Sequence, residues 1–356
     1  MGADVVVIGS GLAGSAAASS ISQLGHRVTV LERFEEAHIR GSSHGAERVF
    51  RLTYEDPAYI HLGLDALNGW AVLEKATGTS LLHQVGMLDH GDETQLKNLE
   101  EICASNGVEL HRVSANEAAR RWAGLKFDSD VLVQPIGGWI AADLALKAFS
   151  TCATSNGAEF RYNSRVLSVT KTSTSRWSVE TLNGAVDADV VVVATAGWTH
   201  DLLGSIIGEQ IEIPPINVTT EVVAYFERRD RSSWPSFCHH IDPEIYGLPS
   251  PDGLVKIAEH GTGAVTHPDE RSFEAPIATI KRLEEYAQRW LPGVIPSAVR
   301  SATCLYAATA SDDFFIERSG SIIFGVGLGG HGFKFGPAIG DQIADLVADA
   351  LSEEAQ

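Results

Sequence analysis

The chain has 356 residues, more than one typical hydrophobic core, so we expect two closely joined domains. Its 44% hydrophobic content is ordinary for a globular enzyme, and its net charge of −19 argues against nucleic acid and anionic membrane surfaces as partners. No apolar run approaches the length that spans a bilayer.

Four scattered cysteines, Cys103, Cys152, Cys238 and Cys304, show no metal-ligand spacing. No signal peptide precedes the first predicted strand. We therefore expect a reduced, cytoplasmic protein with no structural disulfide and no metal site.

An apolar, β-branched run at residues 5–8 predicts a buried strand that leads directly into a glycine-rich turn. Gly9 allows a tight turn, Gly11 lets the backbone approach a pyrophosphate, and Gly14 lets the next helix lie close to the strand. That helix offers free N–H groups and its positive end to phosphates. Strand, G-x-G-x-x-G loop and alanine-rich helix together predict dinucleotide binding.

A second predicted strand, at residues 28–31, ends at Glu32, eighteen residues after Gly14. An acidic side chain there accepts hydrogen bonds from a ribose hydroxyl and argues against a 2′-phosphate. The alternative interpretation is a glycine turn in some other α/β fold.

Two further stretches complete the predicted nucleotide fold. Residues 190–197 form a buried-type strand that ends in small residues. Strands at 314–316 and 322–324, joined by a turn at 319–320, precede a glycine-rich loop and a final helix. The apolar face of that helix is formed by Ile339, Ile343, Leu346, Val347 and Leu351.

This organisation assigns residues 1–82, 139–208 and 311–356 to a nucleotide-binding domain. Residues 83–138 and 209–310, of mixed strand and helix character, are assigned to an inserted substrate domain. The cleft between two such domains is the expected place for a substrate.

Three constellations carry candidate chemistry, and the first lies at residues 42–51. If this segment is helical, His44, Arg48 and Arg51 are spaced i, i+4 and i+7 and share one face. Such crowding of cations is unfavourable unless an anion or an electron-rich group compensates it. The alternative is a solvated basic face.

The second constellation is a predicted strand at residues 253–260. Alternation places Lys256 and His260 on one face with Leu254 and Ala258, and the apolar Val255 and Ile257 on the other. A site and a sheet with one wet face are both compatible with this pattern.

The third constellation spans residues 329–336, before the last helix. Its glycines let backbone N–H groups approach a ligand, and the helix start adds positive potential. Lys334 lies at that end, where a cation is disfavoured unless an anion binds, so we favour a functional role over a structural one.

Seven motifs in this order resemble the amine-oxidising flavoproteins of the D-amino-acid oxidase superfamily, most of all its monomeric sarcosine oxidase and N-methyltryptophan oxidase group. The resemblance covers essentially the whole chain. The matching segments are 9–14, 42–51, 194–198, 246–250, Lys256 with His260, 304–306 and 329–335.

The resemblance implies an α/β fold in which a Rossmann-like FAD-binding domain, of the glutathione-reductase-like kind, holds an inserted α+β, sheet-based substrate domain. It implies FAD as the cofactor, bonded covalently through Cys304, whereas the three other cysteines remain small buried hydrophobes. The implied cofactor contacts are Gly9, Gly11, Gly14, Glu32, Arg33, Ser42, Ser43, Val166, Ala196, Gly197, Trp198, Cys304, Gly329, Gly330, His331, Gly332 and Lys334.

The resemblance also implies roles for the charged residues. Arg51 and Lys334 would clamp the substrate carboxylate, for which a planar two-pronged donor and a point charge form a sensible pair. His44 and Arg48 would lie against the opposite flavin face, where their positive potential assists covalent attachment.

Lys256 would promote the reaction of the reduced flavin with O2, because a cation stabilises developing superoxide. Tyr246 and His260 would line the substrate pocket, with His260 tuning the protonation of the bound amine. The implied reaction is hydride transfer from a secondary amine in an amino acid to flavin N5, with an imine and H2O2 as products.

The amine itself stays open: sarcosine, a bulkier N-methyl amino acid and a cyclic imino acid all fit. A flavin dehydrogenase that passes electrons to a carrier, and a flavoprotein subunit without turnover of a free amine, are the alternatives. An NAD-dependent dehydrogenase is more distant. We expect a monomer that acts on a small molecule.

Overall fold

The structure is a computed structural model that describes residues 3–173, 176–207 and 212–354. Its central element is a six-stranded sheet in the order β21-β22-β13-β1-β2-β9, parallel except for β21. The strands are β1 (Val5–Ile8), β2 (Val28–Leu31), β9 (Glu159–Arg161), β13 (Val190–Val193), β21 (Phe315–Ser319) and β22 (Ile322–Val326). The strands predicted at 5–8, 28–31, 190–193 and 322–324 are confirmed.

Both faces of this sheet are covered, which explains why its strands are continuously apolar. Val5 and Val7 point to one face, where they pack against α1 (Leu12–Gln23), α5 (Ala142–Ser155) and α8 (Gly336–Glu354). In the final helix Ile339, Ile343 and Val347 are fully buried, as its predicted apolar face requires.

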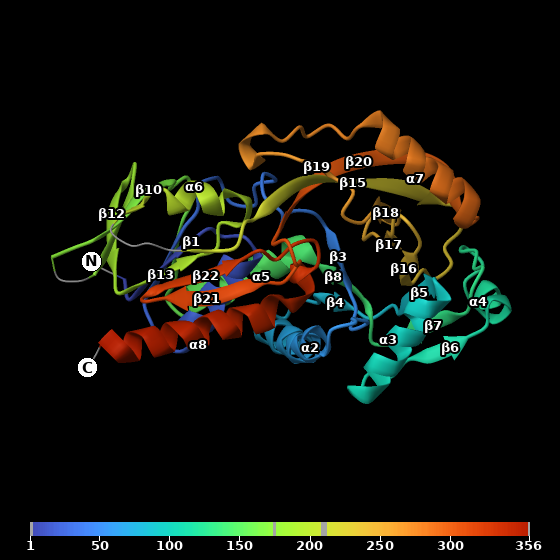
Figure 1. Cartoon of the computed structure of the whole chain (residues 1–356), viewed down its shortest axis with the longest axis horizontal. Coiled ribbons are helices and arrows are strands. Elements are labelled where there is room, and N and C mark those ends of the chain that lie inside the picture. The colour runs from blue at the N-terminus through green and yellow to red at the C-terminus, as the bar shows by residue number, and fades with distance from the viewer. Residues whose placement is uncertain (1–2, 174–175, 208–211, 355–356) are drawn as a thin grey trace.

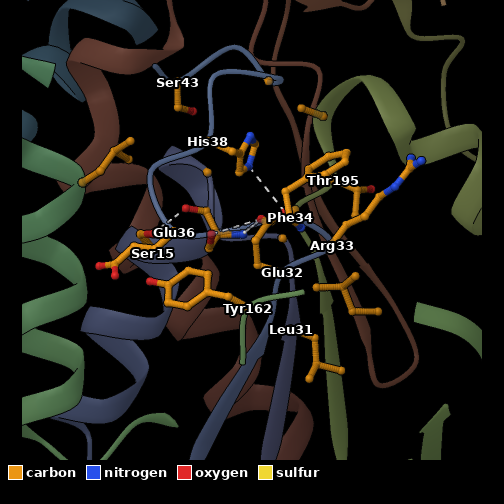
Figure 2. Close-up of a pocket in the computed structure, with 18 of the residues that line it drawn as sticks. Ser15, Leu31, Glu32, Arg33, Phe34, Glu36, His38, Ser43, Tyr162 and Thr195 are labelled. Atoms are coloured by element: carbon orange, nitrogen blue, oxygen red, sulfur yellow. Dashed lines mark hydrogen bonds and ion pairs between the residues drawn. The ribbon is translucent and has the colours of Figure 1, made fainter. Parts of the chain in front are cut away.

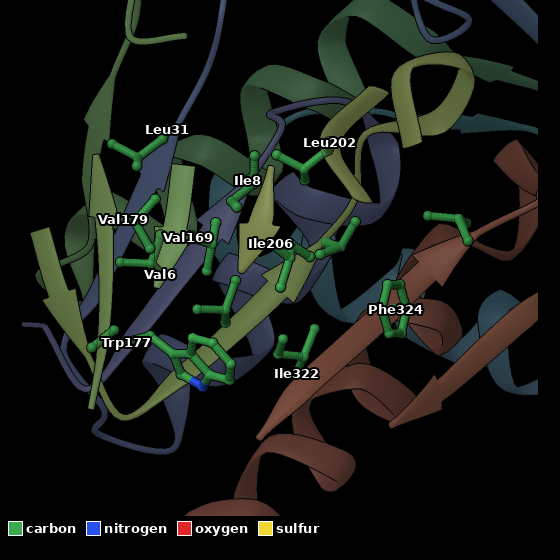
Figure 3. Close-up of a cluster of buried hydrophobic side chains, with 14 of the residues drawn as sticks. Val6, Ile8, Leu31, Val169, Trp177, Val179, Leu202, Ile206, Ile322 and Phe324 are labelled. Carbon is green, nitrogen blue, oxygen red and sulfur yellow. The ribbon is translucent and has the colours of Figure 1, made fainter. Parts of the chain in front are cut away.

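The opposite face carries Val6 and Ile8, which pack against a second, four-stranded sheet (Figure 3). That sheet has the order β12-β11-β10-β14, and Trp177 fills the space between the two layers. Its strands are β10 (Val166–Lys171), β11 (Trp177–Thr181), β12 (Gly184–Ala188) and β14 (Ile206–Ile207).

A nine-stranded sheet forms the other half of the molecule, with α7 (Ile277–Trp290) lying along its long strands β15 and β20 (Figure 1). The order is β19-β15-β18-β17-β16-β5-β7-β6, and β20 pairs with β15. Its strands are β5 (Met87–Gly91), β6 (His111–Val113), β7 (Val131–Gln134), β15 (Asn217–Arg228), β16 (Ser236–His240), β17 (Ile245–Pro249), β18 (Val255–Glu259), β19 (Ala264–Val265) and β20 (Val294–Ala308).

Two separated stretches of chain build this sheet, because β5 pairs in parallel with β16. Helices α3 (Glu93–Ser105) and α4 (Ala115–Arg121) belong to the first stretch. The domain boundaries predicted above stay a prediction, and the one between 208 and 209 lies outside the described residues.

Residues 47–50, for which a helix was considered, instead form a strand of a small sheet in the order β3-β8-β4. Its strands are β3 (Glu47–Phe50), β4 (Leu82–His83) and β8 (Gly138–Ala141), and the remaining helices are α2 (Pro57–Thr77) and the short α6 (Thr199–Leu203). Gly45 has φ of 106°, which ends any helix there, and residues 47–50 hydrogen-bond to β8 instead. The i, i+4, i+7 argument was therefore wrong.

The close packing of the glycine loop requires glycine at two of its positions, Gly9 and Gly14. Gly9 has φ of 101°, and a Cβ there would meet the Ala194 carbonyl oxygen at 2.5 Å. A Cβ on Gly14 would lie 1.9 Å from the carbonyl oxygen of Gly9. The helix α1 can therefore start this close to β1 only because both positions are glycine.

Gly14→Ala is expected to lower the free energy of unfolding by about 3 kcal/mol, the upper end for overpacking, because the clash is with backbone that cannot rotate away. Urea unfolding measures this, with Gly204→Ala as the matched control, since its Cβ would have no neighbour closer than 3.7 Å. Equal stability of the Gly14 variant and the control would contradict the close approach.

Candidate active site

A long cavity of about 580 Å³ follows the glycine loop (Figure 2). Its walls are formed by the ends of β1, β2 and β13 and by the loop that follows β2. The predicted cofactor residues that line it are Gly9, Gly11, Glu32, Arg33, Ser42, Ser43, Val166, Ala196 and Trp198. His44 lines it as well.

Glu32 is buried at the end of β2 and accepts hydrogen bonds from the backbone N–H of Ser10 at 2.8 Å and of Phe34 at 3.0 Å. Burial alone would raise the pKa of this carboxyl. The His38 imidazole, 3.4 Å away, and the Ser10 amide outweigh burial and hold the pKa below its usual value. The carboxylate is therefore ionised and fixed in the wall of the cavity.

The start of α1 faces the same cavity, and no side chain caps it at Gly11. The hydroxyl of Ser43 instead accepts a hydrogen bond from the Leu12 N–H at 3.0 Å. The buried Ser42 Oγ has no hydrogen-bond partner among the residues that the structure describes. Uncapped helix N–H groups and an unsatisfied hydroxyl are suited to hydrogen-bond a bound phosphate or ring.

A second cavity, of about 120 Å³, lies between β3, the sheet strands β15–β18 and β20, and the loop before α8. All seven predicted catalytic residues line it: His44, Arg48, Arg51, Tyr246, Lys256, His260 and Lys334. His331 lines it as well. Sequence segments more than 280 residues apart thus supply one pocket.

A smaller space of about 90 Å³ joins the two cavities. Gly11 and Ser42 belong to it and to the first cavity, while Arg48, Cys304 and Tyr306 belong to it and to the second. Its walls include the predicted Gly329, Gly330 and Gly332. A Cβ on Gly330 would meet the Tyr306 ring at 2.2 Å, so only glycine fits beside that ring.

Two predicted cofactor residues do not line these cavities. Gly14 is used for the packing of α1 on β1, and a Cβ on Gly197 would contact Pro268 and Val218 at 3.4 Å. Their part is to position the neighbouring backbone.

His44 lies in the turn before β3 and Arg48 lies in β3 itself, and both line the second cavity although the segment is not helical. The Arg48 guanidinium donates to the carbonyl oxygens of Ser42 at 2.9 Å and Glu47 at 3.0 Å. Burial lowers the pKa of His44 to about 3, and repulsion from Arg48 adds to this, so the ring is neutral. Its buried Nε2 has no hydrogen-bond partner in residues 3–173, 176–207 and 212–354.

Arg51 and Lys334 meet at Tyr54. The Lys334 ammonium donates to the Tyr54 hydroxyl at 2.8 Å and to the His331 carbonyl at 2.8 Å, while the Arg51 guanidinium lies 4.5 Å from the centre of the Tyr54 ring. Burial, followed by repulsion from Arg51, moves the pKa of Lys334 well below its usual value. Among the described residues no carboxylate forms an ion pair with either cation.

Lys256 lies in β18 with its neighbours arranged as predicted, since Val255 and Ile257 are buried in the core behind the strand. Its ammonium donates to the Glu47 carbonyl at 3.1 Å and lies 3.6 Å from the Glu47 carboxylate. Burial, reinforced by Arg48, lowers the pKa of Lys256 to about 8. The lysine is therefore still mostly charged at neutral pH.

Sequence reasoning missed the acidic side chains at this pocket. Glu221 and Glu244 line it, and Glu47 is fully buried beside it. Glu244 precedes Tyr246 by two residues, a spacing that would have placed both on one face had a strand been predicted for this segment. Burial raises the pKa of Glu221, and the hydroxyl of Thr219 opposes this shift.

His240 connects Glu244 to a second buried carboxylate. Its Nε2 lies 2.9 Å from Asp89 and its Nδ1 lies 3.1 Å from Glu244. Burial would lower the pKa of this imidazole, but the two carboxylates raise it to about 9. The charged ring holds Glu244 at the edge of the cationic pocket.

A family model described as "FAD dependent oxidoreductase" matches residues 4–346. The chain belongs to this family. The predicted recognition of the D-amino-acid oxidase superfamily is thereby confirmed, and the glycine loop and its cavity belong to a FAD-dependent enzyme.

Relatives in this family span nearly the full chain. A probable sarcosine oxidase of Arabidopsis thaliana is 29% identical, covering 97% of this chain and 88% of the relative. The monomeric sarcosine oxidase of Bacillus sp. (strain B-0618) is 26% identical, covering 98% and 93%. The N-methyl-L-tryptophan oxidase of Yersinia pestis is also 26% identical, covering 98% and 96%. The prediction of a FAD-dependent amine oxidoreductase is confirmed at this level.

Solved structures of the family have the same fold. The open form of NikD, an unusual amino acid oxidase essential for nikkomycin biosynthesis, is 28% identical with a TM-score of 0.86, covering 98% of this chain and 94% of that chain. The L-proline dehydrogenase of P. horikoshii is 21% identical, also with a TM-score of 0.86 and the same coverage. The predicted fold class is therefore confirmed. In the described part of the chain no helix is long and apolar enough to cross a membrane.

The pH dependence of stability tests the charged His240 network of this FAD-dependent enzyme. The pKa of about 9 exceeds the unfolded value of 6.5, so the stabilisation is fully present below pH 6.5 and is lost as the pH rises through about 9. His240→Gln is expected to remove about 3 kcal/mol of unfolding free energy at low pH and much less above pH 9.

Urea unfolding at a series of pH values measures this difference, with His111→Gln as control. His111 is also paired with a carboxylate, Glu109 at 3.4 Å, but its side chain is 51% exposed. A His240 variant whose loss of stability is the same at pH 6 and pH 9.5 would contradict the charged network.

Proposed function

We propose that this protein is a FAD-dependent oxidase of a secondary amine in an amino acid, such as an N-methyl amino acid or a cyclic imino acid. The observation that carries the proposal is that the half-buried Arg51 and the buried Lys334 both contact Tyr54, and that no carboxylate of the described residues forms an ion pair with either. Two such cations that repel each other are best explained by a bound anion, and a substrate carboxylate is an anion of suitable size.

The chain's residues fit FAD. The long cavity at the glycine loop suits the adenosine and pyrophosphate, and the connecting space leads from it to the cationic pocket. Unpartnered Ser42 Oγ and His44 Nε2, together with the cradle at Gly330, are available to the flavin ring. When bound, FAD would accept a hydride from the carbon next to the substrate nitrogen and pass two electrons to O2, giving an imine and H2O2.

Covalent attachment through Cys304 is part of this proposal. The Cys304 thiol belongs to both the connecting space and the cationic pocket, 3.4 Å from the Ser42 carbonyl and 4.0 Å from the Arg48 guanidinium. Cys103, Cys152 and Cys238 have no such position in the connecting space.

The remaining residues of the pocket would orient and deprotonate the amine. Arg51 and Lys334 hold the carboxylate, and their positive charge lowers the pKa of the nearby substrate nitrogen. The pKa of His260 is lowered by burial against the opposing effect of Glu244, so this ring is neutral and can accept a proton. Tyr246, with a pKa raised to about 12 mainly by burial, stays a neutral hydrogen-bond donor.

Lys256 would serve the reaction with O2. It lies in β18 and lines the cationic pocket, and its buried ammonium would stabilise developing superoxide. We further propose that the enzyme is a cytoplasmic monomer; the name of the Bacillus relative includes "monomeric". The domain division given above remains part of the proposal.

Anaerobic mixing of the yellow, flavin-loaded protein with N-methyl and cyclic amino acids tests the function. We expect one of them to bleach the flavin and air to restore the colour with one H2O2 for each substrate. Bleaching without recovery in air, but with rapid electron transfer to dyes, would indicate a dehydrogenase. No bleaching by any amine would contradict the proposal.

Cys304→Ser is expected to bind flavin that dissociates on acid precipitation, whereas the wild type keeps its flavin, because a hydroxyl at this position forms no thioether. Absorbance of the acid supernatant measures the released fraction. Cys152→Ser is the control, since Cys152 lies outside all three cavities. Flavin that stays fixed to the Cys304 variant would refute the linkage.

Lys256→Met is expected to slow flavin reoxidation at least about 100-fold, a loss of several kcal/mol of electrostatic stabilisation, while flavin reduction changes far less. In the wild type, reoxidation should also slow as the pH rises through about 8, the pKa of Lys256, and this dependence should vanish in the variant.

Stopped-flow absorbance of the two half-reactions measures these rates separately. Lys97→Met is the control, because Lys97 is 73% exposed and forms an ion pair with its exposed neighbour Glu101 on α3. Equal slowing of reduction and reoxidation in the Lys256 variant would contradict the proposed role.

A further inference from the structure

Two histidines lie side by side on the face of the nine-stranded sheet that is turned away from the cationic pocket. Strand β5 lies beside β16 (Figure 1). The two strands pair in parallel with His90 directly opposite His239. Their neighbours Asp89 and Cys238 point to the pocket side, while Leu88 and Phe237 share the histidines' side and belong to the core.

Both imidazoles are buried, and their nitrogens are poorly satisfied. His90 is 1% exposed and His239 is fully buried. Within the described part of the chain, neither nitrogen of His90 has a hydrogen-bond partner, and Nε2 of His239 has none either. Such unsatisfied buried groups are rare in folded proteins and call for a missing partner.

Asp128 supplies a third potential ligand at the edge of this pair. Its carboxylate lies 4.0 Å from the His239 Nε2, and one ligand atom from each of the three residues lies within 4.8 Å of the others. The Asp128 side chain is 57% exposed and so connects the buried rings to solvent. Two imidazoles and one carboxylate are a donor set typical of zinc and similar divalent transition metals.

Tyr286 orients His239 for this role. The Tyr286 hydroxyl, on α7, lies 3.0 Å from Nδ1 of His239. A proton on Nδ1 that is donated to this hydroxyl leaves the Nε2 lone pair free and directed at Asp128. Histidine ligands of metals commonly hold their second nitrogen in this way.

We propose that His90, His239 and Asp128 form a binding site for one divalent transition-metal ion, zinc being the simplest candidate. Nothing in the sequence predicted a metal, because the three ligands are separated by 38 and 111 residues, and they meet only through strand pairing and the loop before β7. The ion would tie β5, β16 and that loop together on the far side of the sheet from the flavin cavities.

Ion binding requires a modest local rearrangement. Zinc at about 2.1 Å from each ligand needs ligand atoms roughly 3.4 Å apart, so the present spacing must contract by about 1 Å. The rings now stack at 4.0 Å with planes 25° apart and must turn to face a shared ion. His90 has no hydrogen bond to break, and Asp128 is free to move at the surface.

Zinc titration of the untagged, flavin-loaded full chain against a chromophoric chelator tests the site. We expect one zinc per chain, and a loss of affinity of at least about 100-fold in Asp128→Asn, because even loss of an outer partner costs 10–100-fold. His90→Phe should lose the site as well, and Tyr286→Phe should weaken it by about 10–100-fold. Replacing zinc by Co²⁺ should give visible bands of low-symmetry coordination that Asp128→Asn lacks.

His111→Gln is the control, since it removes a surface histidine beside a carboxylate and should leave zinc affinity unchanged. Asp128→Asn changes an exposed side chain, so it remains informative even if His90→Phe fails to fold. Absence of stoichiometric zinc from the wild type, or equal affinity in wild type and Asp128→Asn, would overturn the proposal.

Discussion

The proposed activity depends most on a cluster of buried and half-buried cations in one small pocket. Arg48, Arg51, Lys256 and Lys334 line the same cavity, in a chain whose net charge is −19. Burying like charges together is costly, and only Lys256 has a carboxylate close enough to form an ion pair within the described part of the chain. The pocket is therefore prepared for an anion that the protein itself does not supply.

The fold supplies the rigidity that this arrangement needs. Arg48 lies in β3, Lys256 in the well-buried strand β18, and Lys334 in the short turn before α8. Each position is fixed by backbone pairing or by packing of the glycine loop and of α8 on the six-stranded sheet. The cations cannot relax outward into water, so their electrostatic influence on a bound amine and on O2 is retained.

Local sequence predicted what depends on local physics. Continuous β-branched runs predicted β1, β2 and β13, because the strands of a sheet that is covered on both faces are buried on both sides. In β18, the alternation of residues predicted that Lys256 and the core residue Ile257 lie on opposite faces. The family resemblance then brought together seven catalytic candidates that do line one cavity, although no spacing argument could have joined Arg51 to Lys334.

What the sequence did not predict arises from long-range pairing. Residues 47–50 pair with β8, a partner about 90 residues away, and this replaced the helix that the spacing of basic residues suggested. Glu244, Asp89 and His240 form a network only once β5 lies beside β16. The stacked pair His90 and His239 depends on the same strand register.

The central claim is that the cationic pocket binds the carboxylate of an amino-acid substrate beside the flavin. Equilibrium titration of the flavin spectrum with an N-methyl amino acid, and with the neutral amide of the same compound, tests it most directly. Removal of one negative charge from a dry, doubly cationic site should weaken binding by at least about 100-fold, or about 3 kcal/mol. Equal affinity for the acid and the amide would contradict the account.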